Sequence, residues 1–125
     1  MACRITGLVL KSRDPEALAR FWCEVLDFVV HAQADEGVGI GPREGADGPQ
    51  AELVLLRSDE PRNGRLPLHI DVNATDRDQD AELERLLAAG AERVDIGQTG
   101  QEPWYVLADP EGNEFCLLRP RVDPV

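Results

Sequence analysis

The sequence predicts an α+β fold made of two similar modules, each containing one strand, one helix and then about three strands. The first indication is a repeated segment: "ADGPQAELVLLR" at 46–57 returns as "ADPEGNEFCLLR" at 108–119, 62 residues later. The second is that Asp14 and Asp76, also 62 residues apart, each stand before a helical pattern. Two features at one offset, close to half of the chain length, indicate an internal duplication.

The first module is predicted over about residues 4–57. Residues 4–10 (RITGLVL) are rich in branched apolar residues, which favours a strand. A helix then begins with Asp14 as its N-cap and Pro15 in its first position, where the missing N–H costs nothing. Its core-facing stripe is predicted at helical spacing: Leu18, Phe21, Trp22, Val25 and Leu26. Three further strands are predicted: FVVHA (28–32), a short one around 38–40, and AELVLLR (51–57).

A linker is predicted at 58–65, because Pro61, the Asn63–Gly64 pair and alternating charges are typical of exposed turns. The second module, about 66–119, repeats the order of the first. We expect a strand over 66–74 and a helix over 76–91, with Asp76 near its cap and Gly90 as its stop.

The second module is predicted to end with three strands and two connections. A short strand is expected at 92–96, followed by a flexible loop at 97–103. The strands WYVLAD (104–109) and EFCLLR (114–119) are joined by the turn "DPEGN", whose Pro and Gly suit a hairpin.

Alternation along strands predicts which side chains share a face. In the last strand of the first module, Glu52 is predicted to point away from Leu53 and Leu55. In the last strand of the second module, Glu114 and Cys116 are predicted to point away from Phe115 and Leu117. In the fifth strand one face is apolar and packs on the helix: Leu66, Leu68, Ile70 and Val72. Pro67, His69 and Asp71 lie opposite. A carboxylate on an inward face is costly unless it is paired or bound to a metal.

Composition excludes several classes of partner. The chain of 125 residues has 24 acidic and 13 basic side chains, a net charge of −11, so we expect it to bind no nucleic acid. We find no apolar run of membrane-spanning length and no signal peptide, so we expect no membrane partner and a cytoplasmic protein. The acidity serves either solubility or a cavity that attracts a cationic small molecule.

Three cysteines and one histidine receive no special role from the sequence. Cys3, Cys23 and Cys116 lack metal-like spacing and are predicted to be reduced, mostly buried thiols. His31 is predicted to be an ordinary structural or surface histidine. Segment 35–50, rich in Gly and Pro, is expected to be either a lid or a disordered segment.

The whole pattern resembles the vicinal-oxygen-chelate superfamily, which includes glyoxalase I, extradiol dioxygenases, fosfomycin-modifying enzymes and bleomycin-resistance proteins. The resemblance covers about residues 4–119 and is carried by "DPEALARFW…VLDF" and "WYVLADPEGNEFCLLRP". It implies a curved mixed sheet or half-barrel around a cleft, with the helices outside. We also expect a homodimer, since most such assemblies are symmetric pairs.

The same resemblance implies a site. Its metal ligands fall on Glu52, His69 and Glu114, while the fourth family position falls on Gly7, which cannot coordinate. Such donors would accept Mn²⁺, Fe²⁺, Ni²⁺ or Zn²⁺, and either glutamate is a candidate catalytic general base. The expected cavity-lining residues of the site are Gly7, Asp71, Trp104 and Cys116.

Two functions follow from the resemblance. The first is a metal-dependent lyase, isomerase or dioxygenase that acts on a small oxygenated molecule. The alternative is a metal-free, drug-sequestering protein of the bleomycin-resistance type, in which Trp104 and Tyr105 form an aromatic wall for the ligand. Trp104 has a simpler interpretation as a core residue, as Trp22 does.

Overall fold

A computed structural model describes residues 2–43, 50–61 and 64–123. The chain divides after Pro61 into two compact units, which we call module one and module two and describe separately. The division lies within the predicted linker 58–65, whose Asn63 is outside the described residues, as are Ala46 and Asp47 of the repeated segment. No helix in the described part of the chain is long and apolar enough to cross a membrane.

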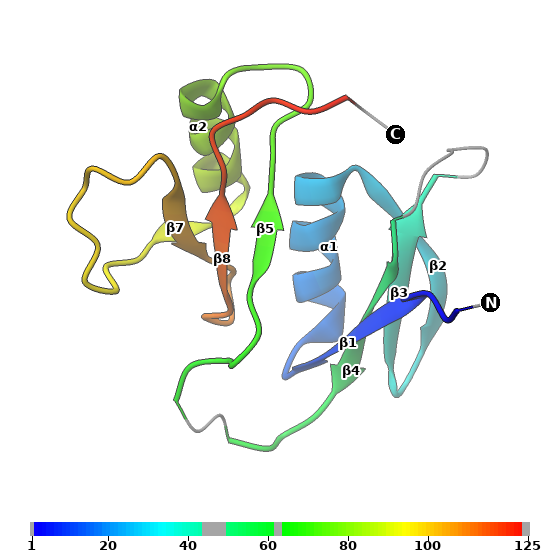
Figure 1. The fold of residues 1–125 in the computed structure, drawn as a ribbon. Helices are drawn as coiled ribbons and strands as arrows, with labels where there is room; N and C mark the ends of the chain where they lie inside the picture. Colours follow the sequence, from blue (N-terminus) through cyan, green and yellow to red (C-terminus); the bar gives the residue numbers. More distant parts are fainter. Residues whose placement is uncertain (1, 44–49, 62–63, 124–125) are drawn as a thin grey trace. The chain divides into compact units, whose positions relative to one another are not determined.

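Module one contains one helix and a four-stranded mixed sheet (Figure 1). Its elements are β1 (Gly7–Ser12), α1 (Pro15–Leu26), β2 (Phe28–Ala34), β3 (Gly37–Pro42) and β4 (Glu52–Arg57). The strand order is β1-β4-β3-β2, with β1 parallel to β4 and the other neighbours antiparallel.

Module two has the same arrangement in shorter strands. Its elements are β5 (Ile70–Val72), α2 (Gln79–Ala89), β6 (Glu92–Arg93), β7 (Tyr105–Ala108) and β8 (Glu114–Leu117). The strand order β5-β8-β7-β6 repeats that of module one, including the single parallel pair. The predicted α+β class with two similar modules is therefore confirmed, and the described strands form two separate sheets that do not close into a barrel.

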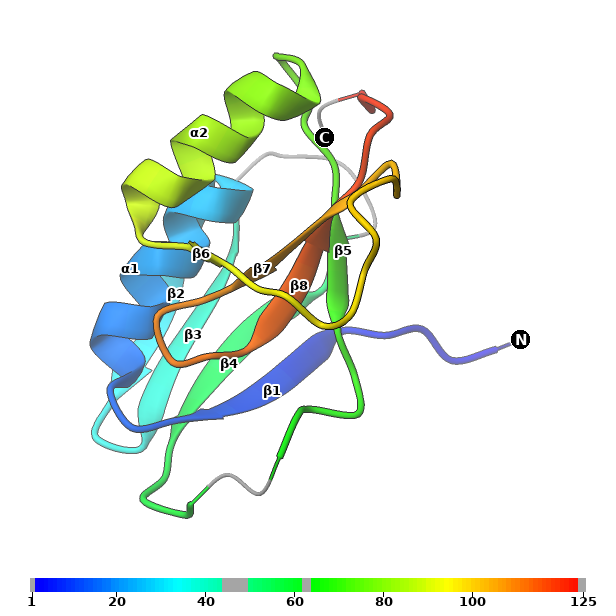
Figure 2. The same ribbon diagram turned by 90° about the vertical axis from the view of Figure 1, so that its left-hand side faces the viewer.

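Helix α1 forms as its sequence predicts. The Asp14 side chain accepts a hydrogen bond from the backbone N–H of Ala17 at 3.2 Å, and Pro15 occupies the first turn. Trp22 is buried, as expected, and its ring meets Phe21 edge to face. The helix packs against β2, β3 and β4, beside which Figure 2 shows it.

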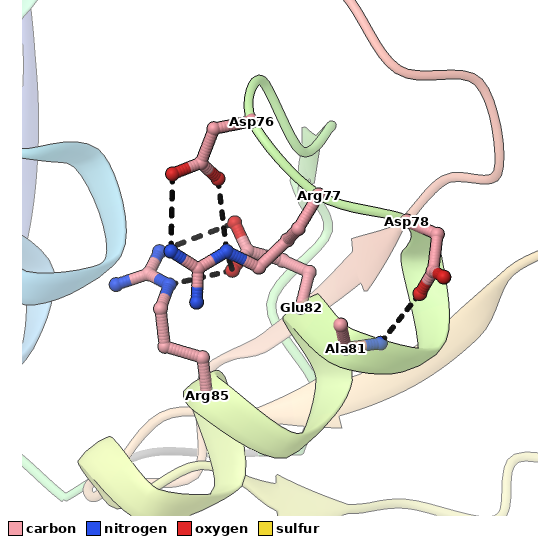
Figure 3. Close-up of polar contacts among 6 residues, drawn as sticks. All are labelled: Asp76, Arg77, Asp78, Ala81, Glu82 and Arg85. Atoms are coloured by element: carbon pink, nitrogen blue, oxygen red, sulfur yellow. Dashed lines mark hydrogen bonds and ion pairs between the residues drawn. The ribbon is translucent and has the colours of Figure 1, made fainter.

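Helix α2 begins two residues later than predicted. Its N-cap is Asp78, whose carboxylate accepts from the backbone N–H of Ala81 at 2.8 Å. Asp76, predicted near the cap, lies two residues before it, and its carboxylate binds the guanidinium of Arg77 at 2.9 and 3.0 Å (Figure 3). The helix ends at Gly90 as predicted, with a φ of 121° that favours glycine.

A buried carboxylate stabilises the start of α2. Glu82 is only 7% exposed, and the guanidinium of Arg85 donates to both of its oxygens (Figure 3). Arg77 approaches the same carboxylate to 3.9 Å. A buried charge is tolerated when it is paired and hydrogen-bonded in this way, so we assign this cluster a structural role.

Strand β5 is shorter than predicted, and its expected apolar face is not formed. The prediction placed Leu66 and Leu68 against the helix, but they precede the strand, and Leu68 is 62% exposed. The parallel ladder pairs Ile70 with Phe115, an offset of 115 − 70 = 45 residues. At that offset, residues 66–68 would face residues 111–113, where the chain turns, so β5 has no partner there.

The turn between β7 and β8 forms as predicted and is held by buried polar groups. One oxygen of Asp109 accepts from the backbone N–H groups of Glu111 and Asn113, both at 2.9 Å. The Asn113 side-chain amide donates to the other oxygen at 2.7 Å, and Gly112 takes a φ of 84°. This turn sets the residue at which β8 begins, which is Glu114.

Candidate functional site

The two last strands present their glutamates as the alternation predicts. The opposite face of these strands is buried in the core: Leu53, Leu55, Phe115 and Leu117. The Glu52 side chain is 51% exposed and the Glu114 side chain is 16% exposed. Both glutamates therefore stand at the first residue of their strands, on the face that is not packed into the core of the module.

In module one, Glu52 is paired with His31. Nδ1 of His31 lies 3.1 Å from Oε1 of Glu52, and Nε2 lies 2.8 Å from the carbonyl oxygen of Pro42. A carbonyl only accepts, so Nε2 must carry a proton that it donates to Pro42. The contact between Nδ1 and Oε1 then requires one further shared proton. The pair thus consists of an imidazolium beside a carboxylate, or of the two neutral groups.

The charged form is favoured. The hydrogen bond to Glu52, followed by the hydrogen bond to the Pro42 carbonyl, raises the pKa of His31 above its ordinary value. The carboxylate predicted as a metal ligand thus already has a hydrogen-bonded partner in module one, and the contact favours the protonated form of that partner.

Two local features bring His31 to Glu52, and neither was used in the sequence interpretation. The register between β2 and β3 shifts between Val30 and Ala32, which leaves His31 as the extra residue of a β-bulge. A Cβ on Gly41 would lie 2.7 Å from Cε1 of His31 and 3.2 Å from Cγ of Glu52. Glycine at position 41 therefore provides the space in which the pair forms, and this glycine was the available sequence signal.

The fourth family position, Gly7, lies beside Glu52 in the parallel ladder. A Cβ at this position would lie 3.8 Å from the nearest heavy atom, the carbonyl oxygen of Glu52, which is an ordinary contact. Position 7 therefore has room for a side chain but supplies no donor.

In module two, Glu114 is paired with Arg65. Nε of Arg65 donates to Oε1 of Glu114 at 2.5 Å, from the segment that precedes β5. Arg65 was predicted to lie in the linker 58–65, and no function was predicted for it. The glutamates of both modules therefore have a basic side chain as partner, an imidazole in one case and a guanidinium in the other.

Module two also gathers three donors of different chemistry. One ligand atom each from His69, Asp71 and Cys116 lies within 4.8 Å of the other two. Nε2 of His69 is 3.3 Å from Oδ1 of Asp71, and Asp71 faces Cys116 across the ladder. Burial, then the charges of Asp71 and Glu114, raise the pKa of the Cys116 thiol, a direction that a bound cation would reverse. Asp71 and Cys116 were predicted only to line a cavity.

The predicted ligand set spans both modules. Glu52 belongs to module one, whereas His69 and Glu114 belong to module two. The three-residue set therefore stays a prediction.

Aromatic residues and cysteines differ in part from expectation. Trp104 is 41% exposed, so its interpretation as a core residue was wrong. Tyr105 donates from its hydroxyl to Asp80 at 2.6 Å. The prediction of mostly buried thiols was wrong for Cys3, which is exposed and precedes the first strand; the other two cysteines are half-buried. Of segment 35–50, residues 37–42 form β3, while 44–49 lie outside the described residues.

Comparison with known proteins identifies the family. The profile of the glyoxalase-like domain matches residues 7–118, nearly the whole chain. This chain belongs to the glyoxalase-like family. The match confirms the resemblance to the vicinal-oxygen-chelate superfamily that the sequence motifs indicated. No curated protein matches the sequence.

Several solved structures share the fold of this glyoxalase-like chain. The fosfomycin resistance protein FosX from Listeria monocytogenes has a TM-score of 0.71 at 14% identity, over 98% of this chain and 94% of that one. A glyoxalase/bleomycin resistance protein/dioxygenase family enzyme from Burkholderia phytofirmans has 0.66 at 20% identity, over 92% and 97%. FosX from Mesorhizobium loti has 0.66 at 18%, over 94% and 92%. At sequence identities this low, the structural similarity shows a common fold only.

Proposed function

We propose that this glyoxalase-like protein is a divalent-metal-dependent enzyme, acting as a lyase, isomerase or dioxygenase on a small oxygenated molecule. The observation that carries the proposal is the set of donors in module two, where an imidazole, a carboxylate and a thiol lie within 4.8 Å of one another. Such donors fit Mn²⁺, Fe²⁺, Ni²⁺ or Zn²⁺. The net charge of −11 further favours a cation.

The residues divide into two roles under this proposal. His69 is the imidazole ligand of the metal, which when bound supplies a Lewis acid toward the substrate oxygens. Glu52 and Glu114 are assigned to proton transfer, since an ionised carboxylate can accept a proton as a general base and return it. The group that would exchange a proton with Glu52 is Nδ1 of His31, which lies 3.1 Å from Oε1 of Glu52.

Names of the solved neighbours support an enzymatic or resistance role. FosX proteins are described as fosfomycin resistance proteins, and the Burkholderia protein as an enzyme of the glyoxalase, bleomycin resistance and dioxygenase family. Fold alone carries many chemistries, so the assignment to a reaction must come from the site.

Metal analysis of the purified protein tests the proposal. We expect about one divalent ion per chain in the wild type, measured by elemental analysis and by titration. His69→Ala should lose it, whereas the matched change in the other module, His31→Ala, should retain it. No binding at micromolar metal, or equal loss in both variants, would contradict the proposal.

A second candidate is the metal-free binding of a cationic aromatic molecule. Three observations favour it: Gly7 supplies no donor, both glutamates are already paired with basic side chains, and Trp104 exposes part of its surface. An exposed indole stacks on flat or cationic ligands. In chelator-treated protein, a cationic aromatic compound should quench the fluorescence of Trp104 and not that of buried Trp22. Trp104→Phe should abolish the quenching; unchanged quenching would exclude this candidate.

We also propose that the chain forms a homodimer. Large apolar side chains are exposed in both modules, which supports an interface: Ile5, Val9, Val30, Leu68 and Ile96. Sedimentation equilibrium should show a concentration-dependent dimer, and a monomer at the highest concentration would contradict the proposal.

A further inference from the structure

We infer that His69, Asp71 and Cys116 together form the metal site of module two, and that it is a site for a thiophilic divalent ion such as Zn²⁺. This inference rests on the proposed metal-dependent function and specifies it. It replaces the family-position glutamates, which stand on β4 and β8, with Asp71 on β5 and Cys116 on β8.

The geometry of the backbone brings the donors to one side of the sheet. Asp71 on β5 and Cys116 on β8 are direct neighbours in the parallel ladder. His69 precedes Asp71 by two residues, and side chains two apart along an extended chain share a face. The alternation in β8 agrees, because Phe115 and Leu117 on either side of Cys116 are buried in the core.

The distances suit a small tetrahedral ion. Nε2 of His69 and Oδ1 of Asp71 are 3.3 Å apart. Two ligands with bonds of about 2.0 Å to a tetrahedral zinc are separated by about 3.3 Å. All three donor atoms lie within 4.8 Å of one another, so small rotations of partly exposed side chains bring the sulfur into range. Three protein ligands leave a fourth position for water or substrate, as in catalytic zinc sites.

The chemistry of the donors selects the kind of metal. A thiolate beside an imidazole favours Zn²⁺ and similar borderline ions over Mg²⁺ or Ca²⁺, which prefer oxygen. Glu114 is held by Arg65, so an ion bound there would have to displace a guanidinium at 2.5 Å. The nearest partner of Asp71 is instead His69, which is itself one of the three donors.

Module one provides an internal comparison. At the repeat offset of 62, residues His69, Asp71 and Cys116 correspond to Gly7, Val9 and Val54. Val9 and Val54 are partners in the ladder just as Asp71 and Cys116 are. Within the duplication, the positions that carry three donors in module two carry none in module one.

Cobalt spectroscopy of the full chain tests the inference. Co²⁺ replaces Zn²⁺ in such sites, and a thiolate ligand adds an intense near-ultraviolet charge-transfer band that oxygen and nitrogen ligands do not give. All proteins carry Cys3→Ser, because Cys3 is exposed and could bind the ion on its own. We expect about one Co²⁺ per chain with the thiolate band, and Zn²⁺ should displace it.

Matched variants assign the ligands. Cys116→Ser should remove the band and weaken metal binding at least about tenfold, and Asp71→Asn should weaken it similarly. Cys23→Ser removes the half-buried thiol of module one and should change neither the thiolate band nor the metal affinity. Glu114→Gln should also retain the band. Thermal unfolding of each variant, followed by circular dichroism, confirms that the fold is present.

Two different failures separate this inference from the proposed function. Binding of Co²⁺ without the band, or binding lost in Glu114→Gln and kept in Cys116→Ser, overturns the inference and leaves a metal-dependent enzyme with ligands at the family positions. A failure of the folded chain to bind Co²⁺ or Zn²⁺ at micromolar concentrations overturns both.

Discussion

The two modules share a frame and differ in what surrounds their common glutamate. The buried residues of β4 and β8 correspond at the repeat offset, Leu53 to Phe115 and Leu55 to Leu117, and the strand orders are the same. Glu52, however, meets a histidine from a bulge in β2, two strands away in its sheet, whereas Glu114 meets an arginine from the segment before β5. The core face carries large apolar residues in both modules because packing restricts them. The opposite face has diverged, and the candidate chemistry lies there.

Replacing the matched core leucines by alanine tests whether the two modules have equivalent cores. These substitutions should have the largest effect on the free energy of unfolding. Leu55 and Leu117 are both fully buried. Leu55→Ala and Leu117→Ala should each lower the free energy of unfolding by about 2–5 kcal/mol, because each leaves a cavity. Urea unfolding measures this. Val54→Ala, at a half-buried position, is the control and should cost less. A cost below about 1 kcal/mol in one module only would show that the two cores are not equivalent.

Filling the space at Gly41 should break the arrangement peculiar to module one. In Gly41→Ala the new methyl group would meet the His31 ring, so the pair with Glu52 must separate. We expect about 1–3 kcal/mol of destabilisation and a changed NMR environment of the His31 ring. Gly39→Ala is the control, since its Cβ would lie 3.8 Å from the Cβ of Ala32. Similar spectra for wild type and Gly41→Ala would show that the His31 ring does not lie against this glycine.

Substitutions at the helix N-caps test whether α1 and α2 begin in the same way. Asp14→Ala and Asp78→Ala should each cost about 1 kcal/mol, because each removes an acceptor for a first-turn N–H. Asp76→Ala removes an exposed ion pair with Arg77 and should cost about 0–1 kcal/mol, less than Asp78→Ala. Thermal denaturation of the three variants measures these losses of stability. A larger loss for Asp76→Ala than for Asp78→Ala would show that Asp78 is not the cap.

The smallest expected effect is on pH dependence. The pKa of His31 is raised by Glu52, so the pair stabilises the fold fully below the ordinary pKa of histidine. That stabilisation is lost as the pH rises through the higher pKa of the folded state. The Arg65–Glu114 pair should persist over the same range, because a guanidinium does not titrate there.

An NMR titration of the metal-free protein measures this difference. Glu52→Gln should lower the pKa of His31 toward its ordinary value. Glu60→Gln, which removes a carboxylate of module one paired with Lys11, should leave it unchanged. An unaltered His31 pKa in Glu52→Gln would show that the carboxylate does not hold the proton.

Features that depend on local patterns could be predicted from the amino-acid sequence. Period-two alternation identified the buried leucines and the opposite face of the glutamates, and the Asp14–Pro15 start and Gly90 stop followed from capping chemistry. The repeat predicted the module architecture, and the motifs indicated the family.

The contacts between side chains became visible only in the folded chain. His31 and Glu52 are 21 residues apart, and Asp71 and Cys116 are 45 apart; they meet through a bulge in one ladder and the register of another. The length of β5 likewise depends on where its partner turns. Local periodicity reports which face a residue occupies. The partner on that face is set by strand pairing between distant segments, because pairing register is a property of two strands together.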